Sequence, residues 1–359
     1  MQIATITDIQ KLVVDGFQDW RDFGHVYTKE KDGLILFNYL NEAQYEGTWT
    51  FLERVSRGLI VDKISGEVVA RPFDKFFNWN ENNRTTNAPI KTITEKLDGS
   101  LGILYRDNGF KIATRGSFDS EQAQWATNWL NTHYFETFPD LTAYYNDYTL
   151  LFEIIYPKNR IVVDYEDNAD LFLIAARNRF TGRYLSYSEL LRMNESFNFP
   201  MPKLYNFADL SDILAKLSIL PHNNEGWVVE FEDEQRFKFK GKEYLRVHKI
   251  IHNISFKNTL EAHINDNVQA ILDIVPDEFI DEINEHLEII DDTISKTLMN
   301  VEALFDLAPK NNRKEFALWV NQNHKEYATY LFAQLDGKDI LPLIYKFAFK
   351  EEINENSVC

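Results

Sequence analysis

The sequence predicts an α+β protein in which a domain built on antiparallel sheets is followed by an all-α domain. Up to about residue 250, apolar and aromatic runs with a two-residue period indicate strands. Helical stretches separate these runs at irregular spacing, which favours antiparallel sheets over a repeating βαβ fold. After about residue 255 the period becomes that of amphipathic helices. The predicted domains are therefore residues 1–254 and 255–359.

The expected strands of the first domain are rich in β-branched and aromatic residues. They are residues 34–40, 57–62, 66–73, 101–106, 110–115, 148–156, 169–177, 225–231 and 236–240. Two helices are expected there, from Ser120 to His133 and from Ser186 to Met193, each with serine as its N-cap. The expected helices of the second domain are LEAHINDNVQAILDIV, PDEFIDEINEHLEIIDDTISKTLMNVEALFDL, KEFALWVNQNHKEYATYLFAQL and DILPLIYKFAF, with Pro276 starting one and Pro309 separating two; the tail EEINENSVC is expected to be frayed.

Composition excludes several classes of protein. The only cysteine is Cys359, which removes disulfides, zinc clusters and thiol catalysis and fits a reducing cytosol. The sequence shows neither a signal peptide nor a long apolar run, so a cytoplasmic protein without a membrane span is expected. The net charge of −18 argues against a general nucleic-acid binder, so any polyanion must be held by local basic clusters.

The stretch TEKLDGSLG, residues 94–102, places Lys96 just before an Asp-Gly pair. One interpretation is a surface β-hairpin, since Asp-Gly is a strong two-residue turn. The other is that Lys96 is a nucleophile and the glycine lets a phosphate approach the backbone. If residues 93–97 form a strand, Glu95 points away from the face of Lys96, and Asp98 caps backbone N–H groups. Lys96 would then face a cationic pocket.

Further charged residues interrupt otherwise apolar strands of the first domain. They are Arg57, Lys75, Arg115, Glu153, Glu225, Lys238 and Lys240. Taken singly, each has an ordinary structural explanation: the alternating Lys238 and Lys240 suit a solvated strand face, and Glu153 suits a pair with a structural arginine. In the same way, Phe76 and Phe77 are more typical of a hydrophobic core than of a surface on which a base stacks. Only the occurrence of all these residues in this order indicates a shared site.

In that order, the motifs resemble those of covalent nucleotidyltransferases, the superfamily of DNA ligases, RNA ligases and mRNA capping enzymes. They are SRG with Arg57, KLDGS with Lys96, FEII with Glu153, EGWVV with Glu225 and KFK with Lys238 and Lys240. The stretches RPFDKFFNWNE, SFDSEQA and PKNRIVV resemble more narrowly the phage-type RNA ligase 1 family, whose best-known members repair tRNA. This likeness covers about residues 30–250 and implies an antiparallel-sheet, ATP-grasp-like nucleotidyltransferase domain followed by helices.

The resemblance also implies the roles of individual residues. Lys96 is expected to attack ATP and become lysyl-AMP, with Lys238 and Lys240 neutralising the phosphates. The implied nucleotide-binding residues are Arg57, Lys75, Phe77, Gly99, Arg115, Glu153, Val228 and Tyr244. Phe77 is expected to stack on adenine, and Gly99 to leave room for the nucleotide. Glu225 is expected to hold a divalent metal, with Mg²⁺ as the natural ion for oxygen ligands.

Two positions depart from the family pattern. Arg115 stands where the family often has lysine, and Phe37 stands where a tyrosine would donate a hydrogen bond. The expected substrates are RNA ends carrying a 3′-hydroxyl and a 5′-phosphate, with tRNA as one candidate, and the expected state is a monomer. Two alternatives stay open: another covalent nucleotidyltransferase, such as a DNA ligase or a GTP-using capping enzyme, and a non-catalytic protein that binds RNA ends.

Overall fold

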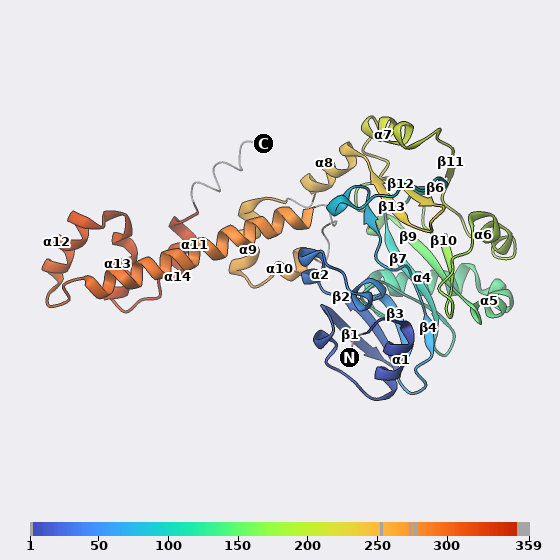
Figure 1. Ribbon diagram of the computed structural model, residues 1–359, viewed down its shortest axis with the longest axis horizontal. Coiled ribbons are helices and arrows are strands. Elements are labelled where there is room, and N and C mark those ends of the chain that lie inside the picture. Colours follow the sequence, from blue (N-terminus) through green and yellow to red (C-terminus); the bar gives the residue numbers. More distant parts are fainter. Residues whose placement is uncertain (1–2, 252–253, 273–274, 276–278, 350–359) are drawn as a thin grey trace. The chain divides into compact units, whose positions relative to one another are not determined.

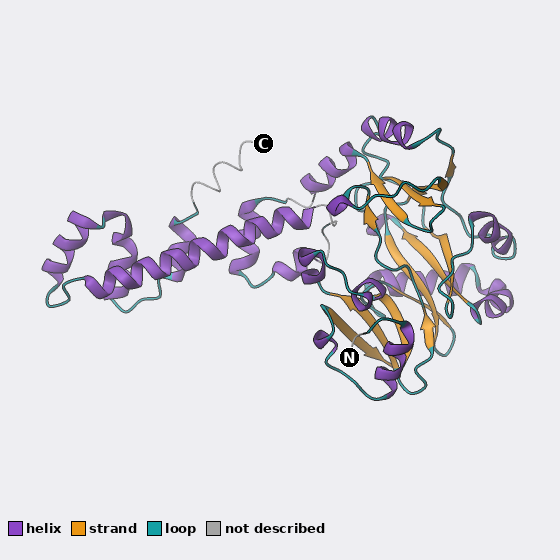
Figure 2. Cartoon of the chain, in the orientation of Figure 1, coloured by secondary structure: helices purple, strands orange, loops and turns teal. Residues whose placement is uncertain are grey.

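The computed structural model describes residues 3–251, 254–272, 275 and 279–349. The chain divides into two compact units, Met1–Ile251 and His252–Cys359 (Figure 1). All described strands lie in the first unit, and the described part of the second is helical (Figure 2). The α+β class predicted from the sequence is confirmed. Pro276 and the tail EEINENSVC lie outside the described residues.

The first unit begins with a four-stranded antiparallel sheet, here called the N-terminal sheet, in the order β1-β2-β3-β4. Its strands are β1 (Val26–Lys31), β2 (Leu34–Tyr39), β3 (Arg57–Asp62) and β4 (Val68–Ala70). The helices of this part are α1 (Ile6–Val14), α2 (Asn41–Glu46) and α3 (Phe51–Val55). Helices α1 and α3 begin at capping boxes, in which the N-cap threonine and the acid three residues later bond each other's backbone N–H.

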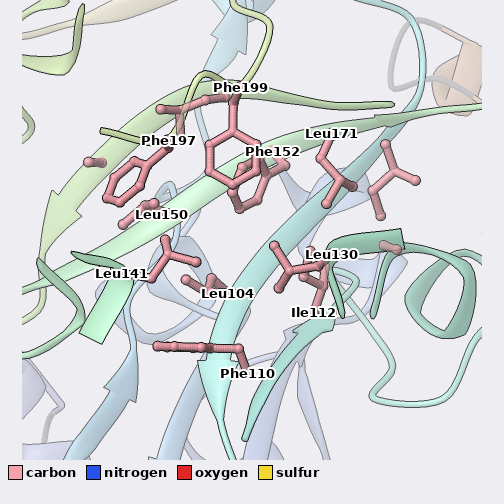
Figure 3. Packing of buried hydrophobic residues seen from close by; sticks show 14 of the residues in the cluster. Leu104, Phe110, Ile112, Leu130, Leu141, Leu150, Phe152, Leu171, Phe197 and Phe199 are labelled. Atoms are coloured by element: carbon pink, nitrogen blue, oxygen red, sulfur yellow. The ribbon is translucent and has the colours of Figure 1, made fainter. Parts of the chain in front are cut away.

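A second antiparallel sheet of four strands, the Glu153 sheet, has the order β10-β9-β7-β8. Its strands are β10 (Asp170–Asn178), β9 (Tyr148–Ile155), β7 (Ser100–Arg106) and β8 (Phe110–Ala113). Helices α4 (Glu121–His133), α5 (Phe138–Tyr145) and α6 (Tyr187–Asn194) pack with it. Ser120 and Ser186 cap α4 and α6, as predicted. Alternate residues of these strands form the core drawn in Figure 3.

The third sheet, called the Lys96 sheet, has five strands in the order β11-β6-β12-β13-β5. They are β11 (Leu204–Tyr205), β6 (Ile90–Lys96), β12 (Gly226–Phe231), β13 (Arg236–Lys240) and β5 (Phe77–Asn78). Only the short contact between β13 and β5 is parallel among its strand pairs. Helix α7 (Leu210–Ser218) precedes β12, and α8 (Lys242–Ile251) follows β13.

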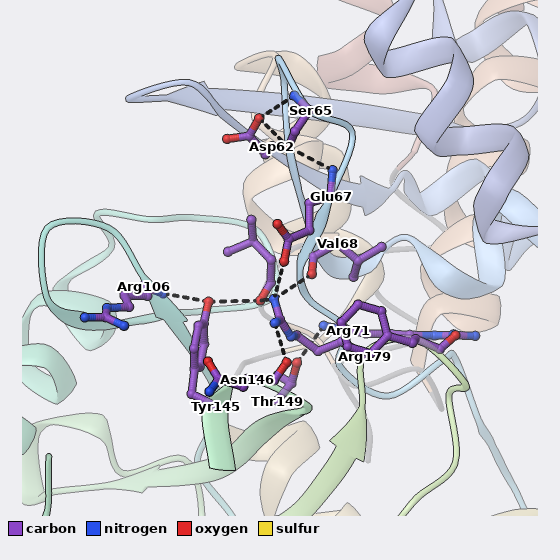
Figure 4. A network of polar contacts seen from close by, with 12 residues as sticks. Asp62, Ser65, Glu67, Val68, Arg71, Arg106, Tyr145, Asn146, Thr149 and Arg179 are labelled. Atoms are coloured by element: carbon purple, nitrogen blue, oxygen red, sulfur yellow. Dashed lines mark hydrogen bonds and ion pairs between the residues drawn. The ribbon is translucent and has the colours of Figure 1, made fainter. Parts of the chain in front are cut away.

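The N-terminal sheet and the Glu153 sheet are joined by a polar network (Figure 4). The guanidinium of Arg179, just beyond β10, donates to Val68 O at 2.9 Å and to Asn146 O at 2.6 Å. The hydroxyl of Tyr145 donates to Val69 O at 3.1 Å. Because these carbonyls belong to β4 and to the loop before β9, the network ties the two sheets together.

The second unit contains six described α-helices. They are α9 (Phe256–Ile264), α10 (Val268–Leu272), α11 (Ile280–Leu307), α12 (Arg313–Asn323), α13 (Ala328–Leu335) and α14 (Leu341–Phe347). Two predicted helices are each divided in two. One breaks between α9 and α10, where Asp266 has φ +53°; the other breaks after Asn323 at a 3₁₀ turn, Lys325–Tyr327. None of the described helices is long and apolar enough to span a bilayer.

The sequence did not predict every element of the first unit. The missed elements are β1, β5, β11, most of β6, and helices α1, α2, α3, α5, α7 and α8. Short 3₁₀ helices at Trp20–Asp22, Glu81–Asn83, Phe135–Thr137 and Pro157–Asn159 complete this unit. The strands predicted around Arg57, Glu153, Glu225, Lys238 and Lys240 were placed correctly, apart from one or two residues at their ends. Lys75, expected to interrupt a strand, lies in no strand, and Arg115 lies two residues beyond β8.

Candidate active site

One face of the Lys96 sheet gathers three of the predicted lysines. Across β6, β12 and β13, Lys96 pairs with Gly226, and Gly226 pairs with Lys240. Two residues further along, Val228 pairs with Lys238. Because side chains two residues apart share a face, Lys238, Lys240 and Lys96 all point to the same side. The expectation that Lys238 and Lys240 share a face is confirmed.

The opposite face of this sheet is its apolar core. The buried residues there are Ile93, Trp227, Val229, Phe231, Phe237 and Phe239. The alternation in RFKFK thus fixes which side chains face the core and leaves Lys238 and Lys240 together. Glu225 has the parity of the core residues Trp227 and Val229, so alternation does not explain its place beside Lys96. Glu95 lies on the face opposite Lys96, as predicted, and its backbone N–H donates to Lys203 O of the neighbouring edge segment at 2.8 Å.

Lys96 and Lys240 are bridged by Glu225. The ammonium of Lys96 lies 2.7 Å from Glu225 Oε2, and that of Lys240 lies 3.3 Å from Glu225 Oε1. The side chain of Glu225 is only 3% exposed, whereas that of Lys96 keeps 20% of its surface accessible. Lys96 therefore contacts a carboxylate directly, and the second lysine lies on the other oxygen of that carboxylate. The surroundings of Lys96 thus combine the predicted cationic group Lys240 with an acid.

Burial and the two ammonium groups act on Glu225 in opposite directions. Burial raises the pKa of its carboxyl, whereas Lys96 and Lys240 lower it. The effect of burial is the larger one, so the pKa of Glu225 remains raised overall. The next residue must be glycine. Gly226 has φ +143°, and a Cβ there would lie 1.9 Å from Phe239 O. The pair Glu225-Gly226 thus places a carboxylate directly before β12.

The segment Leu97–Asp98–Gly99 is not a hairpin. Strands β6 and β7 on either side of it belong to different sheets, so the β-hairpin interpretation is wrong. Asp98 is buried, and its carboxylate accepts the backbone N–H groups of Val162 and Val163 at 2.9 and 2.8 Å. It does cap backbone N–H groups, as expected, but those of a distant segment and not of its own turn.

Two tyrosines hold this crossing segment. Tyr244 of α8 donates its hydroxyl to Asp98 Oδ1 at 2.8 Å. The backbone N–H of Asp98 donates to the hydroxyl of Tyr165, also at 2.8 Å. Tyr244 is buried beside Val162 and Val163. The structure therefore gives Tyr244, expected to bind the nucleotide, a contact that positions the segment following Lys96.

A hydrogen bond between Gly99 and Glu153 ties the segment after the Lys96 sheet to the Glu153 sheet. The N–H of Gly99 donates to Glu153 Oε1 at 3.0 Å. A Cβ on Gly99 would lie 2.6 Å from Ile154 O, so glycine is needed here for the approach of two backbones, whatever space a nucleotide requires. Glu153 thus accepts a hydrogen bond from this N–H and, among the residues that the structure describes, is not paired with a structural arginine, the alternative considered above. Burial raises the pKa of Glu153 to about 7, against the lowering effect of Lys96.

Phe76 lies between two predicted cationic residues. The guanidinium carbon of Arg57 is 5.8 Å from its ring centroid, and the ammonium of Lys238 is 5.5 Å from it. Arg57 opens β3 of the N-terminal sheet, so Phe76 brings it toward the lysine face. Within the described parts of the chain, Arg57 Nη1 is buried without a hydrogen-bond partner. Such a nitrogen can be satisfied by a water or an ion, and one nitrogen each of Arg71, Arg84 and Arg179 is in the same position.

Lys75, Phe77 and Arg115 belong to a cluster of rings and cations around Tyr39. The ammonium of Lys75 lies 5.0 to 5.6 Å from the rings of Tyr39, Trp49 and Phe77. Arg115 donates to the Tyr39 hydroxyl at 2.9 Å. The guanidinium of Arg84 covers Phe77 at 4.1 Å. The structure thus surrounds Phe77 with protein groups.

Phe37 takes no part in this cluster. It is fully buried, and its ring packs edge-on against Trp20 at 4.7 Å. Its neighbour Tyr39 supplies the polar tyrosine contact that the sequence put in doubt at position 37. The two residues have the same parity on β2, but the register of β2 against β3 shifts between Phe37 and Asn38, and irregularities of this kind change the direction of side chains.

A cavity of about 270 Å³ opens beside Lys96 and Glu225. Its wall includes the backbone of Glu95 to Leu97, together with Phe172, Met201, Lys203, Tyr205, Asn223 and Trp227. Phe172 pairs with Glu153 across β9 and β10, which turns both side chains to the same face. The sequence analysis missed Phe172, because within ADLFLIAAR nothing distinguishes it from its apolar neighbours. Phe77 does not line this cavity.

Metal binding was predicted at Glu225. Among the described residues, no group of three or more His, Cys, Asp or Glu side chains is arranged to hold an ion. Mg²⁺ keeps several waters and is usually held by one or two carboxylates and the phosphates of a substrate. A single buried carboxylate fits such an ion, provided that it exchanges lysine contacts for the metal.

The chain belongs to the RNA ligase family, whose family model matches residues 55–245. It is 25% identical to the RNA ligase of Rhodothermus phage RM378, over 88% of this chain and 87% of that protein. It is 26% identical to RNA ligase 1 of Bacteriophage TS2126, over 50% of this chain and 45% of that one. The family predicted from the motifs is confirmed.

Solved RNA ligases also match in part. The structure of a Naegleria gruberi RNA ligase with PPi covers 45% of this chain and 52% of its own, at 20% identity and a TM-score of 0.37.

Proposed function

We propose that this RNA ligase uses ATP and joins a 3′-hydroxyl to a 5′-phosphate through lysyl-AMP and adenylylated RNA. The observation that carries the proposal is the arrangement of Lys96, partly accessible, on a buried Glu225 that also holds Lys240. An amine that is ion-paired and anchored at a strand end is fixed in direction, as a nucleophile at phosphorus must be.

The first step is an attack of Lys96 Nζ on the α-phosphorus of ATP. The new N–P bond forms as the bond to the pyrophosphate oxygen breaks, and the amine loses protons. Glu225 is placed to accept one of them, because it already accepts a hydrogen bond from Lys96 Nζ. The positive charges of Lys240, Lys238 and Arg57 would stabilise the developing charge. Mg²⁺, if held by Glu225, would add charge neutralisation at the phosphates.

In the second step, AMP passes from Lys96 to the 5′-phosphate of an RNA. In the third, a 3′-hydroxyl attacks that phosphate, a phosphodiester forms and AMP leaves. Both are displacements at phosphorus that need the same cationic face. We place the adenine in the cavity beside Lys96, against Phe172, because that cavity is continuous with the nucleophile. The sequence favoured Phe77, whose ring is covered by Arg84.

Repair of tRNA or another broken RNA is the role that we propose for this reaction, in the cytoplasm and as a monomer. We further propose that residues 1–254 carry the chemistry and that residues 255–359 help choose the RNA. A DNA ligase or capping enzyme is less well supported, because those enzymes follow this domain with an OB-fold barrel, whereas the described part of the second unit is helical.

The test is incubation of the protein with Mg²⁺ and α-labelled ATP, or GTP in parallel, followed by a denaturing gel. Label on the protein from ATP alone, lost in Lys96→Ala, is expected. Lys91→Ala is the matched control: Lys91 lies on the same strand and also pairs with a glutamate, Glu230 at 2.8 Å. Absence of label on folded protein that is not already adenylylated would refute the proposal and leave RNA-end binding as the function.

A further inference from the structure

Four rings form a stacked column beside the Glu153 sheet. Tyr156 stacks on Trp125 at 4.3 Å and 14°, Trp125 on Trp129 at 4.9 Å and 19°, and Trp129 on His133 at 3.7 Å and 21°. The last three are four residues apart on α4, and this spacing places them on one side of the helix. Tyr156 lies directly after β9 and completes the row.

This geometry differs from that of the core next to it. In the same unit, Phe110 meets Phe138 at 72° and Tyr145 at 77°, and Phe152 meets Phe199 at 65°. Offset stacks and edge-to-face contacts are both favourable for aromatic pairs, and parallel stacks also occur in the core of the Lys96 sheet, where Trp79 stacks on the buried Phe231 and Phe239 at 19° and 20°. The column differs from those stacks in ending at an exposed ring, which a nucleic-acid base can continue because every base has a flat π face.

The column runs from the core to the surface. Tyr156 is buried, Trp125 and Trp129 are half-buried, and His133 is exposed. Its middle is held in place, because Trp129 Nε1 donates to Asp170 Oδ1 at 3.0 Å, and Tyr134 donates to the same oxygen at 2.6 Å. The outer end is thus a ring on a fixed support, with one face on Trp129 and the other directed away from it.

Helix α4 itself carries little charge, although Asp170 lies beside Trp129 and Glu136 follows His133 by three residues. Helix α4, EQAQWATNWLNTH, has a single acid, Glu121, at its first residue, and no charged residue from Gln122 to Thr132. The inner end of the column is close in sequence to the site: Tyr156 is three residues beyond Glu153. The 3₁₀ turn that follows carries the exposed Lys158, and its Asn159 Oδ1 accepts from Ser100 Oγ at 3.2 Å.

We propose that this column is a binding surface for single-stranded RNA, with one base of the strand stacked on the outer face of His133. The inference rests on the proposed function for its substrate, RNA. It adds a second place, apart from the phosphate-binding face of the Lys96 sheet, where the protein holds the strand. Stacking tolerates any base, so the surface gives affinity without sequence preference.

Fluorescence anisotropy with a labelled single-stranded RNA tests the column directly. His133→Ala is expected to weaken binding about fivefold or more, and His133→Phe to restore it, because the ring and not the imidazole nitrogens is needed. Thr132→Ala, an exposed neighbour on α4, is the control and should bind as the wild type does. Duplex RNA, whose bases are already stacked, should show no difference between the variants.

Equal affinity of wild type and His133→Ala for single-stranded RNA would overturn the inference, as would a failure of His133→Phe to restore binding. Formation of lysyl-AMP requires no RNA, so it is measured on the same preparations. Lack of lysyl-AMP in the wild type would count against the proposed function alone, because the anisotropy measurement does not depend on catalysis. Thermal melting of each variant shows that the fold is kept.

Discussion

Lys96 and Lys240 bind opposite oxygens of one buried carboxylate, Glu225, at 2.7 and 3.3 Å. The pairing of β6, β12 and β13 makes this possible, because Lys96, Gly226 and Lys240 lie side by side in register. The carboxylate therefore fixes the direction of the Lys96 ammonium, which is the role that the proposed reaction requires of it.

Replacing Glu225 by glutamine should slow lysyl-AMP formation about 100-fold, because the amide cannot accept a proton or balance two ammonium charges. The free energy of unfolding should fall by about 1–3 kcal/mol, since two poorly hydrated lysines lose their counter-charge. Labelling rates and urea unfolding measure the two effects.

Glu230→Gln is the matched control for this change. Glu230 lies on β12, which Glu225 directly precedes, and it also holds two cations, Lys91 at 2.8 Å and Arg236 at 3.1 Å. It should lose a comparable amount of stability without the large loss of labelling. If both variants label at the wild-type rate, Glu225 has no role in the chemistry.

The pKa of Glu153, raised from 4.5 to about 7, predicts a pH-dependent stability. Between these pH values the folded protein holds a proton that the unfolded chain releases, so this glutamate's contribution to stability is present at acid pH and is lost as the pH rises through 7. The free energy of unfolding of Glu153→Gln, relative to that of the wild type, should therefore rise by about 1–2 kcal/mol from pH 5 to pH 8. This figure allows for the partial exposure of the site. Urea unfolding at both pH values checks this.

Glu189 provides the opposite case. Hydrogen bonds from the backbone N–H and hydroxyl of Ser186, with Arg183 beside it, lower its pKa to about 2. Its contribution is present above its ordinary pKa of 4.5 and is lost as the pH falls toward 2. Glu189→Gln should thus be less stable than the wild type near neutral pH, and this difference should disappear as the pH falls toward 2. In the same acid range Glu153→Gln should be no more stable than the wild type. Equal pH profiles for wild type and Glu153→Gln would contradict the assignment.

Several charged residues of this site were predictable because they stand within or beside apolar strands, as Glu153 does in β9 and Glu225 before β12. A period of two places Lys238 and Lys240 on one face without further information. What the sequence could not indicate is which strands pair. An Asp-Gly sequence is compatible with a hairpin and with a crossing between sheets, and only the long-range pairing of β6 with β12 decides between them. Phe172 was invisible for the same reason: it becomes distinctive only when β10 sets it opposite Glu153.

Tyr244→Phe tests the support of the segment after Lys96. It removes the hydroxyl that donates to the buried Asp98 carboxylate, a bond to a charged acceptor worth about 1.5–3 kcal/mol. Stability should fall by about that amount, and lysyl-AMP formation should slow, because Lys96 and Gly99 lie on either side of Asp98. A double-mutant cycle with Asp98→Asn should be non-additive.

Tyr187→Phe serves as its control, since Tyr187 donates to Pro202 O at 3.1 Å, away from Lys96 and its contacts. The free energy of unfolding of Tyr187→Phe should fall by about 1 kcal/mol, and lysyl-AMP formation should keep the wild-type rate. If Tyr244→Phe behaves as Tyr187→Phe does, Tyr244 supports only the fold.

Phe172→Leu and Phe77→Leu distinguish the two candidate rings for adenine. Phe172 lines the cavity beside Lys96, so loss of its aromatic face should raise the KM for ATP in lysyl-AMP formation about fivefold or more, with kcat less affected. Phe77 packs edge-on against Trp49 at 5.6 Å and under Arg84, so its replacement should lower stability and change the KM for ATP little. The ATP dependence of labelling and urea unfolding separate these effects. A raised KM in Phe77→Leu, with Phe172→Leu unchanged, would instead assign adenine to the Tyr39 cluster and require Arg84 to move aside when ATP binds.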